Sequence, residues 1–470
     1  MRSTLAHLMA ALPGARMTRD AAFESVSTDS RSAGAGSLFV ALRGEHFDAH
    51  DFLEQVAASG AAAVLVERLP ENSPGGWTLP AIVVPDTLVA LGRIAHQWRS
   101  QFAIPVIGVT GSNGKTTVKE MIGAILAAAF DDGAGPEAAR LATRGNLNNE
   151  IGVPLTLLRL QATHQAAVVE LGMNHPGEIA RLAAIAAPTI GLVNNAQREH
   201  QEFMHTVEAV AQENGCVITA LAPDGVAVYP GDDQYTPLWR ALAGARPSLS
   251  FGLDAGCDVS CSHTANAFGS DLAVTVKGAP GFTLALAAAG LHNVRNALAA
   301  IACSVAAGVP QDAIVRGLEA FAPVSGRLQR KLAACGATVI DDSYNANPDS
   351  VRAAIDVLAQ AGAPRILVLG DMGEVGTQGQ QFHEEIGAYA ASRGIDTVLV
   401  TGELARHVLA SAGARASHHA QFEALLAAVD GALDGNSAAT VLVKGSRFMK
   451  MERVVQHLLG TPHINSKEAH

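Results

Sequence analysis

Short apolar segments alternate with segments of helical periodicity in the first hundred residues. Residues 37–42, 62–66 and 81–84 are typical of buried strands, and helical patterns cover 52–59 and 88–101. The Pro and Gly content of 70–80 predicts a loop. Strands that alternate with helices predict parallel βαβ units, so residues 1–102 are expected to form a small α/β domain.

A second alternation begins near residue 104 and predicts a central parallel-sheet domain over residues 103–322. Its strands are expected at 104–110, 166–171 and 189–194, with a helix at 118–130. A flexible insertion is expected at 131–138. Short β-like pieces at 226–230, 272–278 and 282–287 predict an antiparallel appendage on the same domain.

A third alternation predicts a doubly wound, Rossmann-like α/β domain over residues 323–470. Its strands are expected at 337–340, 365–369, 397–400 and 440–443, and a final helix at 449–459. The polar tail at 465–470 is expected to be disordered.

The length of the chain predicts about three domains, because 470 residues divided by about 150 residues per domain gives about three. The 33 Lys and Arg against 44 Asp and Glu give a net charge of −11, which argues against a nucleic-acid partner. No run of 18 consecutive apolar residues exists, so membrane insertion is not expected. The N-terminus lacks the apolar stretch of a signal peptide, and five cysteines without a CxxC pair favour a cytoplasmic protein.

The sharpest motif is a glycine-rich loop between an apolar strand and a helix. Two glycines allow backbone N–H groups to surround phosphate oxygens, a lysine adds positive charge, and a threonine hydroxyl can bind Mg²⁺. The residues expected to bind the nucleotide phosphates are Gly111, Ser112, Asn113, Gly114, Lys115, Thr116 and Thr117. Val109 departs from the strict phosphate-loop pattern, and the alternative is a turn that only connects strand to helix.

An acidic residue, Glu170, ends the apolar strand at 166–171. An acid at this place, one βα step after a phosphate loop, can hold the metal that bridges nucleotide phosphates. The alternative is a solvated strand end. Together with the loop, Glu170 predicts a Mg²⁺ site shared with Thr116.

This form of the phosphate loop resembles that of the Mur ligase family, the ATP-dependent enzymes that build the peptide stem of peptidoglycan, and folylpolyglutamate synthases share it. Further strings match the family in order: STDSR at 27–31, LFVALRG at 38–44, FDAH at 47–50, NLNNEIGVP at 146–154, LHNV at 291–294, SGR at 325–327, DSYNANPDS at 342–350, GDMGE at 370–374 and KGSR at 444–447. Each string alone is typical of a turn, a helix cap or a surface patch. Their ordered conjunction favours the family.

The resemblance implies a UDP-binding N-terminal domain, a P-loop ATPase-like central domain and a Rossmann-like ligase domain. It implies an ATP-dependent amide ligase that forms an acyl phosphate on UDP-N-acetylmuramoyl-tripeptide and adds D-alanyl-D-alanine, with ATP and Mg²⁺ as cofactors. The resemblance leaves the oligomeric state open, and we expect a monomer. The string at 342–350 favours this step over the earlier ones. The alternatives are another Mur-type ligase, a folylpolyglutamate synthase-like ligase, or a P-loop nucleotide switch without catalysis.

The resemblance also implies roles for individual residues. The expected catalytic residues are Lys115, Glu170, His200 and Arg327, and the expected metal ligands are Thr116, Glu170 and His200. Beyond the loop, nucleotide contacts are expected from Asn293, Asn296, Arg327, Asp342 and Asn345. Substrate contacts are expected from Ser30, Arg31, Arg43, Asp48, Asn146, Asn148, Asn149, Asn347, Lys444 and Ser446.

Two positions depart from the family pattern. Mur ligases commonly carry a carbamylated lysine that helps to hold a second magnesium, and Asn214 stands in its place. An amide cannot be carbamylated, so the neighbouring Glu213, or water, is a hypothetical substitute. The segment QREHQE at 197–202 is more charged than the small-residue stretch expected around His200.

Overall fold

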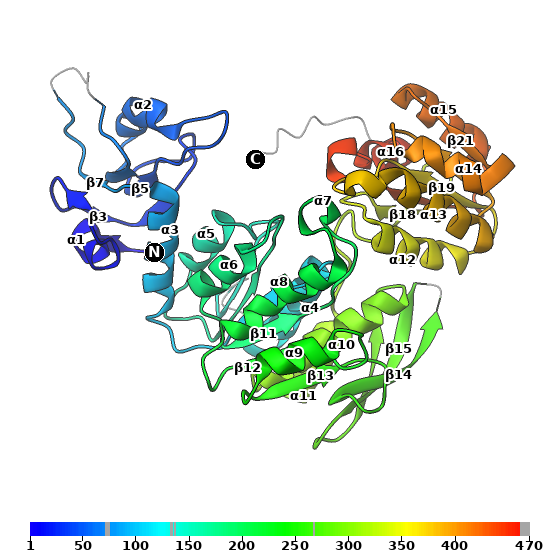
Figure 1. The fold of residues 1–470 in the computed structure, drawn as a ribbon, viewed down its shortest axis with the longest axis horizontal. Helices are drawn as coiled ribbons and strands as arrows, with labels where there is room; N and C mark the ends of the chain where they lie inside the picture. Colours follow the sequence, from blue (N-terminus) through cyan, green and yellow to red (C-terminus); the bar gives the residue numbers. More distant parts are fainter. Residues whose placement is uncertain (71–75, 132–134, 136–137, 267, 461–470) are drawn as a thin grey trace.

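The computed structural model describes residues 1–70, 76–131, 135, 138–266 and 268–460. The expected disordered tail and most of the expected insertion at 131–138 lie outside the described residues, as do residues 71–75 of the expected loop. The chain forms three sheet-based units in a bent row, with the first in blue, the central unit in cyan to green and the last in yellow to red (Figure 1). No described helix combines the length and the apolar character needed to cross a membrane.

The first unit contains a five-stranded sheet in the order β2-β7-β6-β5-β4, parallel except for β2. Its strands are β2 (Arg16–Met17), β4 (Ser25–Ser27), β5 (Ser37–Val40), β6 (Ala63–Val66) and β7 (Ala81–Val83), beside a small sheet of β1 (Ser3–Thr4) and β3 (Ala22–Phe23). Its helices are α1 (Leu5–Leu8), α2 (Leu53–Ala58) and α3 (Thr87–Arg99). The expected strands correspond to β5, β6 and β7, and the expected helices correspond to α2 and α3.

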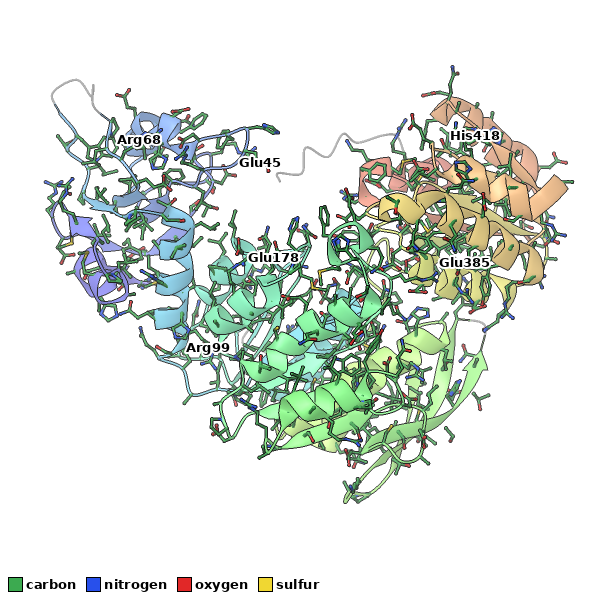
Figure 2. The ribbon with its side chains drawn as sticks, in the orientation of Figure 1. Glu45, Arg68, Arg99, Glu178, Glu385 and His418 are labelled. Carbon is green, nitrogen blue, oxygen red and sulfur yellow. The ribbon has the colours of Figure 1, made fainter. Side chains whose placement is uncertain are left out.

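Helix α3 joins the first unit to the central one. Leu91 and Ile94 share one buried cluster with Leu182 of the central unit. Gly92 permits a close approach, because a Cβ there would lie 2.9 Å from Cδ1 of Ile185. Arg99, labelled in Figure 2 at the end of this helix, donates to the carbonyl oxygen of Ala187 at 3.1 Å. The first unit therefore packs on the central one through apolar contacts.

The central unit is built on a nine-stranded sheet in the order β16-β15-β14-β13-β12-β11-β8-β10-β9. The strands are β8 (Val106–Thr110), β9 (Arg140–Ala142), β10 (Ala166–Glu170), β11 (Ile190–Val193), β12 (Val226–Pro230), β13 (Ser248–Phe251), β14 (Val259–Asn266), β15 (Gly269–Val276) and β16 (Phe282–Leu286). The helices are α4 (Lys115–Phe130), α5 (Gly152–Leu157), α6 (Glu178–Ala186), α7 (Gln201–Met204), α8 (Val207–Thr219), α9 (Thr236–Ala243), α10 (Leu291–Ala306) and α11 (Gln311–Glu319). The central strand β8 is buried along its whole length, as its uninterrupted apolar run predicts.

The extent of the antiparallel appendage was predicted wrongly. Residues 226–230 form β12, which lies parallel between β11 and β13 and belongs to the main sheet. Only β14, β15 and β16 pair in antiparallel fashion, and they extend the same sheet. A short apolar run does not encode its direction, whereas the intervening helix α9 supplies the crossover that a parallel pair requires.

The last unit has a six-stranded sheet in the order β17-β18-β22-β19-β20-β21, parallel except for β17. The strands are β17 (Gln329–Leu332), β18 (Thr338–Asp342), β19 (Arg365–Leu369), β20 (Thr397–Val400), β21 (Ala416–His418) and β22 (Thr440–Lys444). The helices are α12 (Pro348–Ala359), α13 (Gly379–Ser392), α14 (Leu409–Ala412), α15 (Phe422–Leu433) and α16 (Glu452–Leu458). Separate buried clusters cover the two faces of this sheet, so the predicted doubly wound fold is confirmed.

Candidate active site

A cavity of about 700 Å³ lies where the central and last units meet. It is bordered by the segments that follow the carboxyl ends of β8, β10 and β11 and by the ends of β18 and β22. Ligands of open α/β sheets bind at this edge. Of the residues predicted for nucleotide, metal and substrate, it brings together Ser112, Asn113, Gly114, Lys115, Thr116, Thr117, Asn146, Asn148, Asn149, Glu170, His200, Asn293, Asn296, Arg327, Asp342, Asn345, Asn347 and Lys444.

The glycine-rich loop runs directly from β8 into α4. Gly111 and Gly114 have φ angles of +137° and +81°, which side chains with a Cβ rarely adopt. A Cβ on Gly114 would lie 2.4 Å from Oδ1 of Asn296. The loop therefore needs glycine at this position for its backbone conformation and for its packing.

The lysine of the loop has a carboxylate partner. Nζ of Lys115 donates to the carbonyl oxygens of Gly111 and Ser112 at 2.5 and 3.2 Å, and to Oε1 of Glu199 at 2.9 Å. Both ion-pair side chains are largely buried, at 14% and 12% exposed. The positive charge of the loop is thus already paired within the chain.

Glu170 and Thr116 both border the cavity and contact each other. Oγ1 of Thr116 donates to Oε1 of Glu170 at 3.2 Å, and Nδ2 of Asn148 donates to the same oxygen at 2.7 Å. The second oxygen, Oε2, is buried without a hydrogen-bond partner among the described residues. A hydroxyl beside an unpartnered carboxylate oxygen suits Mg²⁺, which binds few protein ligands and completes its shell with phosphates and water. The described residues contain no cluster of three or more acidic, His or Cys side chains arranged for a metal.

His200 lies between two carboxylates. Its Nε2 is 3.4 Å from Oε1 of Glu199, and its Nδ1 is 2.6 Å from Oε2 of Glu374 in the last unit. Burial alone would lower the pKa of His200, but hydrogen bonds and the charges of the two carboxylates outweigh it and raise the pKa to about 9. A protonated ring has no lone pair for a metal. The metal role of His200 stays a prediction that requires the ring to lose its proton and a carboxylate partner.

A row of asparagine side chains links the loop to α10. Nδ2 of Asn194 donates to the carbonyl oxygen of Asn113 at 2.8 Å and to Oδ1 of Asn296 at 2.9 Å. Nδ2 of Asn296 donates in turn to Oδ1 of Asn293 at 3.1 Å. Asn293 and Asn296 of α10, which are predicted to contact the nucleotide, therefore also help to hold the loop in position.

Arg327, at the junction of the central and last units, packs over the ring of Tyr344 at 4.3 Å. Its guanidinium nitrogens have no hydrogen bond to any described residue. This cation borders the cavity with its hydrogen-bonding capacity free.

The last unit contributes a buried lysine and a helix cap. Nζ of Lys444 donates to Oδ2 of Asp342 at 2.5 Å and to the carbonyl oxygen of Asn345 at 2.9 Å. Asn347 caps α12 and contacts Asn113. Ser446 is buried and does not border the cavity, and its hydroxyl accepts from the backbone N–H of Gly373 at 2.6 Å.

The asparagines of the predicted substrate loop differ in their contacts. Asn146 is exposed and Asn148 orients Glu170. Oδ1 of Asn149 accepts from the backbone N–H of Gly152 at 2.8 Å at the start of α5. Asn149 therefore stabilises the start of α5. The presence of this asparagine in the motif is explained by local structure.

The four predicted substrate residues of the first unit, Ser30, Arg31, Arg43 and Asp48, do not border this cavity. Arg31 pairs with Asp29 at 2.8 Å on the surface. Asp48 contacts Arg43 at 3.6 Å and Arg68 at 2.8 Å. Burial acts to raise the pKa of Asp48, but the hydrogen bonds of Arg68 and His50 hold it well below its usual range. On the first unit, Arg43, Asp48 and Arg68 therefore form one group of charged side chains, and Arg31 with Asp29 another.

The two departures from the family pattern have definite positions. Asn214 is buried in α8, and its Oδ1 accepts from the backbone N–H of Gly111 at 2.9 Å. Glu213, the hypothetical substitute anion, accepts from the N–H groups of Gly177 and Ile179, both at 2.9 Å, at the start of α6. Its carboxylate does not border the cavity, and a metal role of Glu213 stays a hypothesis.

Apart from His200, the residues of the charged segment 197–202 received no role from the sequence. Arg198 binds Asp349 of α12 at 2.6 Å and Glu385 of α13 at 2.7 Å, which Figure 2 labels in the last unit. The partner of Glu199 is Lys115, 84 positions away in the chain. The unusual number of charged residues in this segment was the one sequence feature that could have indicated these contacts. Charged side chains that are buried in a site need partners of opposite charge.

Comparison with known proteins agrees with this architecture. Models of the Mur ligase family match three stretches: "Mur ligase family, catalytic domain" at 22–99, "Mur ligase middle domain" at 109–304 and "Mur ligase, glutamate ligase domain" at 326–447. The chain belongs to the Mur ligase family. Among Mur ligases, it is 39% identical to UDP-N-acetylmuramoyl-tripeptide–D-alanyl-D-alanine ligase of Escherichia coli (strain K12), over 97% of this chain and 98% of that one. It is 36% identical to the same-named ligase of Bacillus subtilis (strain 168), over 93% of each chain.

Solved Mur ligase structures are similar over the whole chain. MurF from Acinetobacter baumannii superposes with a TM-score of 0.90 at 34% identity, covering 98% of this chain and 99% of that chain. MurF ligase from Thermotoga maritima in complex with ADP superposes with a TM-score of 0.81 at 26% identity, covering 93% and 97%. A folylpolyglutamate synthase from Mycobacterium tuberculosis is 18% identical with a TM-score of 0.63, covering 80% and 95%, which shows a shared fold alone.

Proposed function

We propose that this chain is the ATP-dependent ligase that joins D-alanyl-D-alanine to UDP-N-acetylmuramoyl-tripeptide in peptidoglycan precursor synthesis. The observation that carries the proposal is the shared cavity, which is lined by Lys115, Thr116 and Glu170 of the central unit together with Asn347 and Lys444 of the last unit. A phosphate-binding loop and polar side chains of a second unit in one cavity suit the activation of a carboxylate and its capture by an amine. The names of the full-length relatives support the choice of substrates.

The phosphate loop would bind the nucleotide. Backbone N–H groups of the loop and Lys115 would neutralise the phosphates, and the start of α4 adds its positive dipole end. Thr116 and Glu170 would hold Mg²⁺, which lowers the cost of charge build-up on the transferred phosphoryl group. Asn148 holds the Glu170 carboxylate in place through Oε1 and leaves Oε2 free.

The residues around the junction would complete the reaction. The γ-phosphoryl group passes to the tripeptide carboxylate, and the amine of D-alanyl-D-alanine then attacks the acyl phosphate and releases phosphate. Arg327, whose guanidinium is free of hydrogen bonds to described residues, is placed to bind the transferred group. Asn293, Asn296, Asp342 and Asn345 would border the nucleotide, and Asn347 and Lys444 the dipeptide side. Exclusion of water from the cavity would protect the acyl phosphate.

We further propose the division into domains at 1–102, 103–322 and 323–470. In this division Ser30, Arg31, Arg43 and Asp48 of the first unit bind the UDP-sugar, since the guanidinium groups of Arg31 and Arg43 are largely exposed and suit a diphosphate. The chain is proposed to act as a monomer in the cytoplasm. Light scattering of the purified chain tests the monomer directly, because a dimer would double the measured mass.

Identification of the reaction product tests the proposed function. The purified chain, incubated with ATP, Mg²⁺, UDP-N-acetylmuramoyl-tripeptide and D-alanyl-D-alanine, should yield one UDP-pentapeptide per ADP, as measured by mass spectrometry. ADP without the amide product would contradict a ligase and favour a nucleotide switch.

A further inference from the structure

The carboxylate of Glu199 binds Lys115, the lysine of the phosphate loop. The two residues meet at 2.9 Å, and both border the cavity with Thr116 and Glu170. Oε2 of Glu199 is buried and has no hydrogen-bond partner among the described residues. An ionised carboxylate so placed presents to the lysine the same oxygen chemistry as a phosphate.

The side chains of Lys115 and Glu199 are largely enclosed by the protein, at 14% and 12% exposed. Water therefore reaches the two groups only in part, and each charge depends on the other for compensation. The two residues form a largely buried ion pair.

The hydrogen bonds of Lys115 leave no free donor. An ammonium group has three N–H donors, and the lysine uses them on Gly111, Ser112 and Glu199. The first two acceptors are backbone carbonyls of the loop itself, whereas the third is a side chain from another segment. A phosphate that binds Lys115 without distorting the loop must therefore displace Glu199.

We propose that Glu199 is an internal counter-ion of Lys115, which pairs with the lysine in the nucleotide-free protein and is displaced by the nucleotide phosphate. This inference rests on the proposed function, since it requires that the loop binds a nucleotide. Nε2 of His200 lies 3.4 Å from the same carboxylate, so a ring nitrogen is close to Glu199 when the lysine is released. Glu199 is thus a positioning residue: it sets the cost of nucleotide binding.

The test is a fluorescence titration of the full chain with a fluorescent ADP analogue in the presence of EDTA, which removes any contribution of Mg²⁺. E199Q should bind ADP about tenfold more tightly than the wild type, because the nucleotide no longer breaks a partly buried ion pair. E202Q is the matched control, since Glu202 loses the same charge from the same segment but is exposed and does not border the cavity. E202Q should bind like the wild type.

A double-mutant cycle separates displacement from simple repulsion between carboxylate and phosphate. In the K115A background, E199Q should leave ADP affinity unchanged, because no lysine remains to be released. Unchanged or weaker binding by E199Q, or tightening that persists in the K115A background, would overturn the inference. E199A, checked for a wild-type unfolding midpoint, provides a second variant should E199Q fold poorly. If the wild type itself does not bind ADP, the proposed nucleotide site fails and this inference with it.

Discussion

Asn347 of the last unit donates a hydrogen bond from Nδ2 to Oδ1 of Asn113 in the phosphate loop, at 2.9 Å. The same side chain caps α12, since its Oδ1 accepts from the backbone N–H of Ser350 at 2.9 Å. One asparagine therefore connects the start of a helix in one unit to the phosphate loop of another.

The first prediction concerns this connection. N347A should lower the free energy of unfolding by about 1 kcal/mol through loss of the cap and should also raise the KM for ATP several-fold. Steady-state kinetics and urea unfolding measure the two effects. D86A is the matched control, because Asp86 caps α3 through Val89 and does not itself border the cavity. Equal KM values for the two variants would contradict a role of the Asn113 contact in nucleotide binding.

A second prediction separates backbone conformation from packing in the loop. G114A should abolish nucleotide binding, because its Cβ would lie 2.4 Å from Oδ1 of Asn296 at a φ of +81°. G278A has a similar φ of +78° with no atom within 4 Å of the new Cβ, so it should cost only about 1 kcal/mol of stability. ADP titration and thermal unfolding of both variants distinguish the two costs. Normal ADP affinity of G114A would refute the tight packing of the loop.

The third prediction addresses Glu170. E170Q should lower kcat by about two to three orders of magnitude and raise the Mg²⁺ concentration needed for half-maximal activity, because an amide is a poorer ligand for Mg²⁺ than a carboxylate. E423Q removes the same charge from an exposed position in α15 and should change neither value. A Mg²⁺ titration of E170Q that superimposes on that of the wild type would remove Glu170 from the metal site.

The fourth prediction concerns pH. The pKa of His200 is raised from 6.5 to about 9 in the folded protein. Its stabilising contribution is therefore complete below pH 6.5 and is lost as the pH rises through 9, with a size of up to about 3 kcal/mol. The stability difference between the wild type and H200N should be large at pH 6 and should vanish near pH 10. H46Q, at an exposed histidine, should follow the wild type at every pH. A difference that does not depend on pH would exclude a charged His200.

The alternation of strands and helices was readable from the sequence because buried parallel strands are continuous apolar runs. The phosphate loop was readable because glycine, lysine and threonine at fixed spacing meet a local geometric need, as Gly114 illustrates. The direction of β12 was not readable, since pairing with β11 and β13 is set by the crossover and not by the strand itself.

Contacts between segments that are distant in the chain could also not be predicted from the sequence. Lys115 and Glu199 are 84 positions apart, and only folding brings them to 2.9 Å. Two adjacent residues of one motif also differ in what they contact. Asn148 orients Glu170, whereas Asn149 stabilises the start of α5. Adjacent positions in one motif thus make contacts of different kinds, and the sequence of the motif does not distinguish them.

Phosphate release, measured as each of the four components is omitted in turn, tests the central claim most directly. We predict rapid release only when ATP, Mg²⁺, UDP-N-acetylmuramoyl-tripeptide and D-alanyl-D-alanine are all present, and a loss of at least about a thousandfold in K115A, because phosphoryl transfer depends on charge neutralisation. Equal turnover when D-glutamate or a diamino acid with its matching precursor replaces these substrates, or full activity of K115A, would contradict the account.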